Sequence, residues 1–138
     1  IATMNPLEGA NEFLNWLRSV VQVIIVSDTY VEFAGPLIEK LGWPTLFCNS
    51  LVIDEEQSVI DYTLRIRDGK RKSVEAFGTI GYQVIAAGDS YNDTAMLSEA
   101  DAGILFRPPE NVKTEFPQFP ITTNYREMKR EIQKIINL

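Results

Sequence analysis

The chain has 138 residues, and 45% of them are hydrophobic. This is enough to form the core of one domain, but the chain is too short for two well-packed domains. Its 13 basic and 19 acidic residues give a net charge of −6 without a long basic run, so no nucleic-acid partner is expected. It has no histidine and a single cysteine, Cys48, which excludes Ser-His-Asp triads, histidine-bound zinc and an internal disulfide.

The sequence also bears on where the protein works. No apolar run approaches the roughly 20 residues that cross a bilayer, so no membrane partner is expected. A lone cysteine is typical of a reducing compartment, and we expect a cytoplasmic protein. The chain begins with Ile1 and shows a helix-start signal at Asn5-Pro6, so we expect it to be part of a longer protein. The oligomeric state is not fixed by the sequence, and a homodimer is left open.

The chain first predicts a helix and a buried strand. Apolar residues recur at helical spacing over 7–20, with Asn5 as the predicted N-cap and Pro6 as the first helical residue. The β-branched run 21–26 is typical of a parallel strand that is covered on both faces. That strand is expected to end at Ser27-Asp28-Thr29.

A second helix and a hairpin follow. The spacing predicts a helix over 30–41, which Pro36 should kink or restart and which Gly42 should close. Residues 45–53 and 59–66 read as two strands joined by an acidic turn, so we expect a small hairpin over 45–66.

The second half of the chain alternates between helices and buried strands, with a proline-rich loop near its end. In chain order we expect a helix over 70–80 with Val74 and Phe77 inward, a strand over 82–87, a helix over 92–100, a strand over 102–106, an extended loop over 108–120 and a helix over 125–136. This alternation predicts an α/β fold with a mainly parallel sheet, read as one domain over 1–138. Ligands of such sheets bind beyond the carboxyl ends of the strands.

The strongest polar cluster is Gly88-Asp89-Ser90-Tyr91-Asn92-Asp93, at the end of an apolar strand. Two carboxylates and an amide in one tight turn suit Mg²⁺, which prefers one or two carboxylates, water and a substrate phosphate. The competing interpretation is structural: Gly88 makes the turn, and Ser90, Asn92 or Asp93 caps the next helix. Spacing alone leaves both open.

Two further residues could bind a phosphate. Ser27 follows a strand and precedes a helix, where a hydroxyl and successive backbone N–H groups favour an anion, although a plain N-cap is the competing interpretation. Lys70 opens the basic run Lys70-Arg71-Lys72 at a helix start. Positive charge there interacts unfavourably with the helix dipole, so another interaction should account for its presence. A bound phosphate would provide such an interaction. The alternative is that these basic side chains simply lie on the solvent-exposed surface.

The order of these signals, strand-Ser, helix-start Lys and strand-Gly-Asp-x-x-Asn-Asp, resembles the haloacid dehalogenase-like phosphatases. The resemblance implies that Ser27 and Lys70 are the catalytic residues of this chain and bind the transferring phosphoryl group. It implies that Asp28 and Asn92 also bind that phosphate, and that Asp89 and Asp93 bind Mg²⁺. Lys72 is a weaker substitute for Lys70, because Val74 and Phe77 follow Lys70 at the family's usual helical spacing.

The match looks closest to one branch, the phosphoserine phosphatases that also transfer phosphate to homoserine, and it covers nearly the whole chain. The stretches that carry it are Ser27 to Thr29, Phe33 to Leu37, Ala86 to Leu97, Gly103 to Phe106, Pro109 to Val112 and Phe116 to Pro120. The resemblance implies a three-layer Rossmann-like fold and a phosphohydrolase or phosphotransferase of a small phosphorylated metabolite, with phosphoserine as the expected substrate.

This sequence departs from the family in one respect that matters for catalysis. The family opens with a strand ending in Asp-x-Asp, whose first carboxylate is phosphorylated, and no Asp-x-Asp occurs here. The cap that selects the substrate is also absent. We therefore expect this chain to lack the nucleophile strand, which should lie between the strands ending at Ser27 and Asp89, and to be inactive alone.

Two other functions compete with this one. A non-catalytic α/β module that binds phosphate or a partner protein would need no nucleophile. A doubly wound nucleotide-binding domain is disfavoured, because no Gly-x-Gly-x-x-Gly or phosphate-binding Gly-Lys-Ser loop follows any strand.

Overall fold

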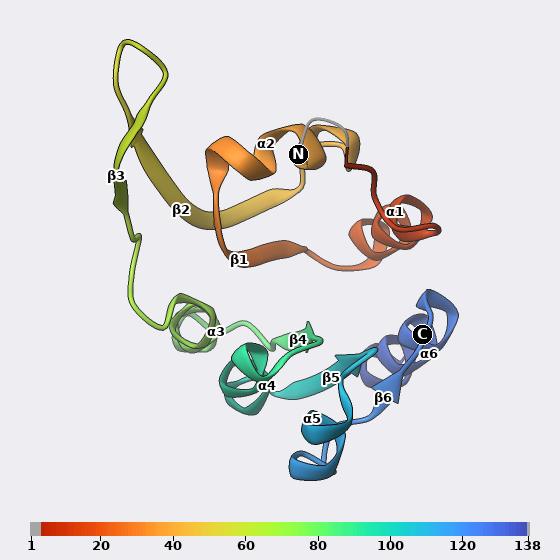
Figure 1. The fold of residues 1–138 in the computed structure, drawn as a ribbon. Coiled ribbons are helices and arrows are strands. Elements are labelled where there is room, and N and C mark those ends of the chain that lie inside the picture. The colour runs from red at the N-terminus through yellow and green to blue at the C-terminus, as the bar shows by residue number, and fades with distance from the viewer. Residues whose placement is uncertain (1–3, 138) are drawn as a thin grey trace. The chain divides into compact units, whose positions relative to one another are not determined.

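The computed structural model describes residues 4–137, so the expectation about Ile1 lies outside the described residues. The chain forms two compact units, Ile1–Gly69 and Lys70–Leu138. Each has its own three-stranded sheet (Figure 1). The reading of 1–138 as one domain stays a prediction.

The first unit is a parallel strand pair extended by a hairpin. Strands β1 and β2 run parallel, β3 pairs antiparallel with β2, and the sheet order is β1-β2-β3. In chain order its elements are α1 (Ala10–Val20), β1 (Ile24–Tyr30), α2 (Val31–Lys40), β2 (Thr45–Ile53) and β3 (Val59–Thr63). Helix α2 packs along β1 and β2 (Figure 1).

Helix α1 begins later than the sequence predicts. The expected cap at Asn5 and Pro6 is wrong: the helix starts at Ala10, whose N–H donates to the Leu7 carbonyl at 3.0 Å. Gly9 precedes it with φ +81°, a left-handed conformation that glycine adopts without a Cβ penalty. The turn before the helix therefore depends on Gly9.

Strand β1 continues past its predicted end but not as a regular ladder. Val26 pairs with Phe47, and the next pair is Tyr30 with Asn49, so β1 advances four residues while β2 advances two. The residues between Val26 and Tyr30 bulge out of the ladder. The strand is only half-buried, and β2 is its sole partner among residues 4–137.

Helix α2 closes where the sequence predicts. It continues through Pro36 without a restart. It ends as predicted at Gly42, which has φ +79°, and the N–H groups of Gly42 and Trp43 donate to the carbonyls of Glu39 and Ile38. This is the pairing that satisfies the last carbonyls of a helix.

The hairpin predicted over 45–66 is confirmed, although β3 ends at Thr63. Its turn is closed by Asp54, whose Oδ1 accepts hydrogen bonds from the N–H groups of Glu56 and Ser58 at 2.9 and 2.8 Å. Every residue of β3 is exposed.

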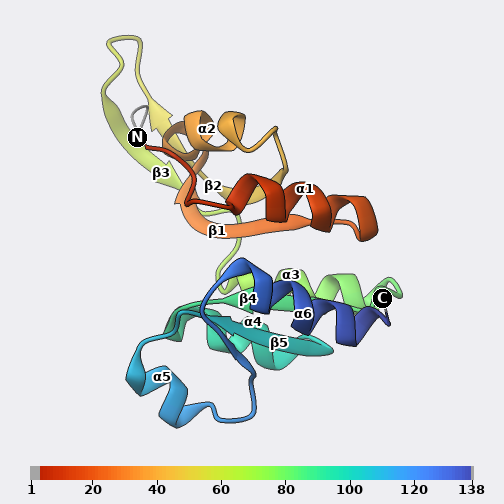
Figure 2. The same cartoon turned by 90° about the vertical axis from the view of Figure 1, so that its right-hand side faces the viewer.

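The second unit is wholly parallel, with sheet order β4-β5-β6. Figure 2 shows α4 and α6 on opposite sides of β5. In chain order its elements are α3 (Gly69–Thr79), β4 (Ile85–Gly88), the 3₁₀ turn η1 (Tyr91–Asp93), α4 (Thr94–Glu99), β5 (Ala102–Phe106), α5 (Glu110–Glu115), β6 (Ile121–Thr122) and α6 (Tyr125–Ile136). Mainly parallel pairing in an α/β chain is as predicted.

The main core cluster of the second unit gathers apolar residues from α3, β4, α4, β5 and α5. Its buried members are Val74, Ala86, Met96, Leu97, Leu105 and Val112. The expectation of an extended loop over 108–120 is wrong, because α5 forms within it. Val112 is completely buried, and its packing stabilises this short helix. The prolines on both sides of the helix made a loop the more obvious prediction.

Within the described part of the chain, no helix combines the length and apolar character needed to cross a bilayer.

Candidate active site

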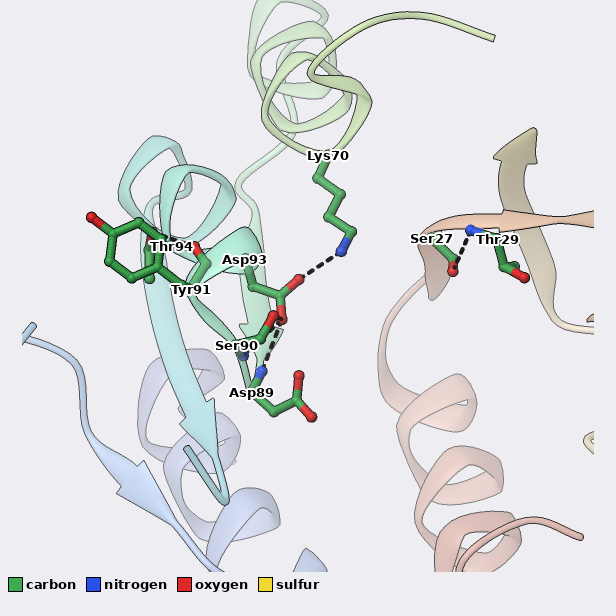
Figure 3. Close-up of polar contacts among 8 residues, drawn as sticks. All are labelled: Ser27, Thr29, Lys70, Asp89, Ser90, Tyr91, Asp93 and Thr94. Carbon is green, nitrogen blue, oxygen red and sulfur yellow. Dashed lines mark hydrogen bonds and ion pairs between the residues drawn. The ribbon is translucent and has the colours of Figure 1, made fainter. Parts of the chain in front are cut away.

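The turn after β4 is organised around the carboxylate of Asp93. Its Oδ2 accepts hydrogen bonds from the N–H groups of Asp89 at 2.9 Å and Ser90 at 3.1 Å, and from the Ser90 hydroxyl at 3.3 Å (Figure 3). The Asp93 side chain thus folds back over the turn and does not cap α4, for which no side-chain cap bond forms. This satisfies N–H groups that the turn would otherwise leave unpaired.

Gly88 makes this arrangement sterically feasible. A Cβ at position 88 would lie 2.4 Å from Asp93 Cβ and 2.6 Å from both Cγ and Oδ2. Such distances lie well inside van der Waals contact, so any side chain there would displace the carboxylate. The glycine is needed for close approach.

Lys70 meets the same carboxylate from the other side. It lies in the first turn of α3, and its Nζ is 2.9 Å from Asp93 Oδ1, with side-chain exposures of 17% for Lys70 and 10% for Asp93 (Figure 3). This ion pair gives the helix-start cation a reason to oppose the helix dipole.

The protonation state of Asp93 follows from these contacts. Burial by itself raises the pKa of its carboxyl. Hydrogen bonds from Lys70 and from the backbone N–H groups of Ser90 and Asp89 outweigh burial and hold the pKa below its ordinary value. Asp93 is therefore ionised at neutral pH and keeps the Lys70 ammonium in place.

Asp89 is the carboxylate that this network leaves to solvent. It follows the last residue of β4, is exposed, and takes part in the turn only through its main-chain N–H. In Figure 3 no dashed line joins its carboxylate to the other residues drawn there. Asn92, on the same turn, is exposed as well.

The donor set fits part of a magnesium site. Exposed carboxylate oxygen is the ligand that Mg²⁺ prefers, and the ion needs only one or two carboxylates when water and phosphate complete its shell. No group of three acidic, cysteine or histidine side chains able to hold a metal occurs among the described residues. The residues present therefore fit an ion that is shared with a substrate phosphate, and not a self-contained protein cage.

In the first unit, Ser27 lies in the bulge of β1. Its Oγ accepts a hydrogen bond from Thr29 N–H at 3.2 Å (Figure 3), a local serine turn. The N-cap of α2 is Tyr30, so the prediction that Ser27 stands directly at the start of the helix is wrong. Asp28 is exposed at the tip of the bulge, and its main-chain carbonyl accepts from Asn49 Nδ2 at 3.1 Å.

The structure brings Lys70, Asp89 and Asp93 together in the second unit and places Ser27 and Asp28 in the first. Asn49 escaped the sequence analysis, and Ser90 was named there only as a possible helix cap. Ser90 donates to Asp93 through its main chain and its hydroxyl, and Asn49 holds the Ser27 bulge. A polar amide interrupting the apolar run of β2 was the available signal for Asn49.

Known proteins of similar sequence point to one family. The chain is 60% identical over 134 residues to phosphoserine phosphatase ThrH of Pseudomonas aeruginosa, a match that covers 97% of this chain and 65% of the relative. It is 56% identical over 137 residues to a phosphoserine phosphatase of Pseudomonas syringae pv. tomato, covering 99% of this chain and 58% of the relative. The chain thus spans about two thirds or less of the length of these curated relatives.

The solved structures support the fold. The crystal structure of a phosphoserine phosphatase from T. onnurineus in complex with NDSB-201 matches 94% of this chain and 60% of that chain, with a TM-score of 0.72 at 23% identity. The Rossmann-like α/β fold that the resemblance implies is therefore confirmed. The family model for haloacid dehalogenase-like hydrolases matches residues 1–101. Because this match covers most of the chain, the chain belongs to the haloacid dehalogenase-like hydrolases.

Proposed function

We propose that the whole protein is a Mg²⁺-dependent phosphomonoesterase or phosphotransferase that acts on a small phosphorylated metabolite, with phosphoserine as its substrate. The observation that carries the proposal is the ion pair of Lys70 with Asp93 beside the exposed Asp89 at the carboxyl end of β4. Ligand sites of parallel sheets lie at this edge. The names of the two Pseudomonas relatives support phosphoserine as the substrate.

In this proposal Lys70 and Ser27 bind the phosphoryl group. The Lys70 ammonium, oriented by Asp93, offsets negative charge on a phosphoryl oxygen, and the Ser27 hydroxyl donates to another. Asp28 and Asn92 are assigned to the surroundings of the phosphate, as the family resemblance implies. Both phosphate-binding groups act by fixed charge and dipole, which need no rearrangement when charge builds up in the transition state.

Mg²⁺ would be held by Asp89 and would supply further positive charge beside the phosphate. Asp93 was predicted as a second ligand, but both its oxygens already accept hydrogen bonds and Oδ1 faces an ammonium. We therefore assign Asp93 to fixing the turn that presents Asp89 and to orienting Lys70. Transfer through an aspartyl phosphate requires an aspartate that is not in this chain, which contains no Asp-x-Asp.

The test compares Asp89→Asn with Glu99→Gln in the full-length protein. Glu99 is an exposed carboxylate at the end of α4 in the same unit and has no assigned role. Phosphate release from phosphoserine is measured over a Mg²⁺ titration, and Mg²⁺ binding is measured by calorimetry. We expect Asp89→Asn to lose Mg²⁺ binding and at least about a hundredfold in turnover, and Glu99→Gln to match the wild type.

Three outcomes would change the proposal. Full activity of Asp89→Asn would remove Asp89 from the metal site. Wild-type turnover of other phosphomonoesters but not of phosphoserine would leave the reaction standing and overturn the substrate. A full-length wild-type protein that binds inorganic phosphate without hydrolysing any phosphomonoester would favour the non-catalytic binding module.

A further inference from the structure

Asn49 occupies the point at which β2 changes partners. The parallel ladder with β1 ends at the pair Tyr30–Asn49, and the antiparallel ladder with β3 begins at the pair Ser50–Thr63. The partner of β2 changes there from β1 on one side to β3 on the other. A side chain with a donor and an acceptor can serve both sides.

The Asn49 carboxamide does serve both sides. Its Nδ2 donates to the Asp28 carbonyl at 3.1 Å, and its Oδ1 accepts from the Arg65 N–H at 3.0 Å. A carbonyl only accepts and a main-chain N–H only donates, so the orientation of the amide follows from its two partners. Asn49 thus ties the bulge of β1 to the segment that leaves β3.

The hydrogen bond from Asn49 to Asp28 is coupled to Ser27 through the peptide group between Asp28 and Thr29. The peptide between Asp28 and Thr29 is planar, so its C=O and N–H point in opposite directions. The C=O accepts from Asn49, and the N–H donates to Ser27 Oγ at 3.2 Å. Fixing the carbonyl therefore fixes the donor that holds the Ser27 hydroxyl.

This arrangement restricts the direction of the Ser27 proton. A hydroxyl has one O–H donor and two acceptor lone pairs, and Thr29 N–H occupies one lone pair. The proton is then directed away from Thr29. Phosphoryl oxygens are acceptors, so a hydroxyl poised to donate is the form that binds them, and hydrogen bonds in a chain polarise one another in that sense.

We propose that Asn49 is a positioning residue, which through the Asp28–Thr29 peptide holds the Ser27 hydroxyl as a hydrogen-bond donor to the phosphoryl group. The inference rests on the proposed phosphatase function and deepens it. Asn49 itself does not contact the substrate. Its effect on catalysis is transmitted wholly by Ser27, and this distinguishes it from a residue that only stabilises the sheet.

The kinetic test is a double-mutant cycle in the full-length protein. Asn49→Asp keeps the acceptor for Arg65 and replaces the donor to Asp28 by a carboxylate oxygen. We expect it to lower kcat/KM for phosphoserine, and the affinity for inorganic phosphate, about tenfold. Combined with Ser27→Ala, it should add less than about twofold, because the two residues act as one unit.

Glu32→Ala is the matched control. Glu32 Oε2 accepts from the Leu51 N–H at 3.0 Å, another bond between a side chain and the β2 main chain, but one that does not touch the bulge. We expect kcat/KM of this variant to stay within about twofold of the wild type. An equal loss in Glu32→Ala, or additive effects of Asn49→Asp and Ser27→Ala, would overturn the positioning role.

A second measurement does not depend on turnover. Amide hydrogen exchange of Thr29, followed by NMR, should accelerate about tenfold in Asn49→Asp and remain unchanged in Glu32→Ala. If the wild type hydrolyses no phosphomonoester, the proposed function fails. The exchange of Thr29 then still decides whether Asn49 holds the bulge, and an unchanged rate in Asn49→Asp refutes it.

Discussion

Replacing Gly88 by alanine tests the geometry of the turn that carries Asp89. The new Cβ would lie 2.4 to 2.6 Å from three atoms of Asp93, so the Asp93 side chain must move. Moving it breaks its hydrogen bonds with Asp89 N–H, Ser90 N–H and Lys70. At about 1 kcal/mol for each, the free energy of unfolding should fall by about 3 kcal/mol.

Gly78→Ala is the control for this experiment. Gly78 lies in α3 of the same unit, and a Cβ there would meet no atom within 4 Å. Alanine is the better helix former, so this variant should gain about 0.5 kcal/mol. Urea unfolding of both variants and the wild type measures the two changes. A Gly88→Ala variant as stable as the wild type would show that Asp93 does not fold back over position 88.

Three more outcomes follow. Because the folded-state pKa of Asp93 is lowered, its stabilisation should be complete above about pH 5 and fade as pH falls below about 4. Urea unfolding over that range should show Asp93→Asn converging on the wild type; a pH-independent difference would contradict this. In the full-length protein, Lys70→Gln should lose about a hundredfold in kcat/KM, and Lys72→Gln less than about twofold. Equal losses in the two variants would contradict the assignment of Lys70 as the cation that binds the phosphoryl group. Finally, phosphate release assays should find no phosphoserine turnover by the 138-residue chain alone, because its sequence lacks an Asp-x-Asp nucleophile.

The elements with strong periodicity could be predicted, and those that depend on tertiary packing could not. Helix α6 has the predicted bounds, and β5 does as well, because each carries an uninterrupted pattern of its own. The start of α1 was misplaced, since Gly9 in a left-handed turn overrode the capping signal at Asn5. Strand β6 is two residues long and is defined by its pairing with β5, which no local pattern reports.

The residues of the candidate site could be identified from the sequence, but the different roles of the two aspartates could not. Asp89 and Asp93 look equivalent as carboxylates in one turn. Only the fold shows that Asp93 is committed to Lys70, 23 residues earlier, and to two main-chain N–H groups. The requirement for Gly88 was likewise hidden, because it comes from a close approach by Asp93 and not from a left-handed backbone.

The pairing of strands has a consequence for how the chain acquires its structure. Ile24 pairs with Thr45 and Ser50 with Thr63, separations of 21 and 13 residues, while Ile85 pairs with Ala102 and Leu105 with Ile121, separations of 17 and 16. Closing loops this short costs little chain entropy, and low contact order favours fast folding. During synthesis the strands β1, β2 and β3 can pair with one another before the ribosome has finished the second unit.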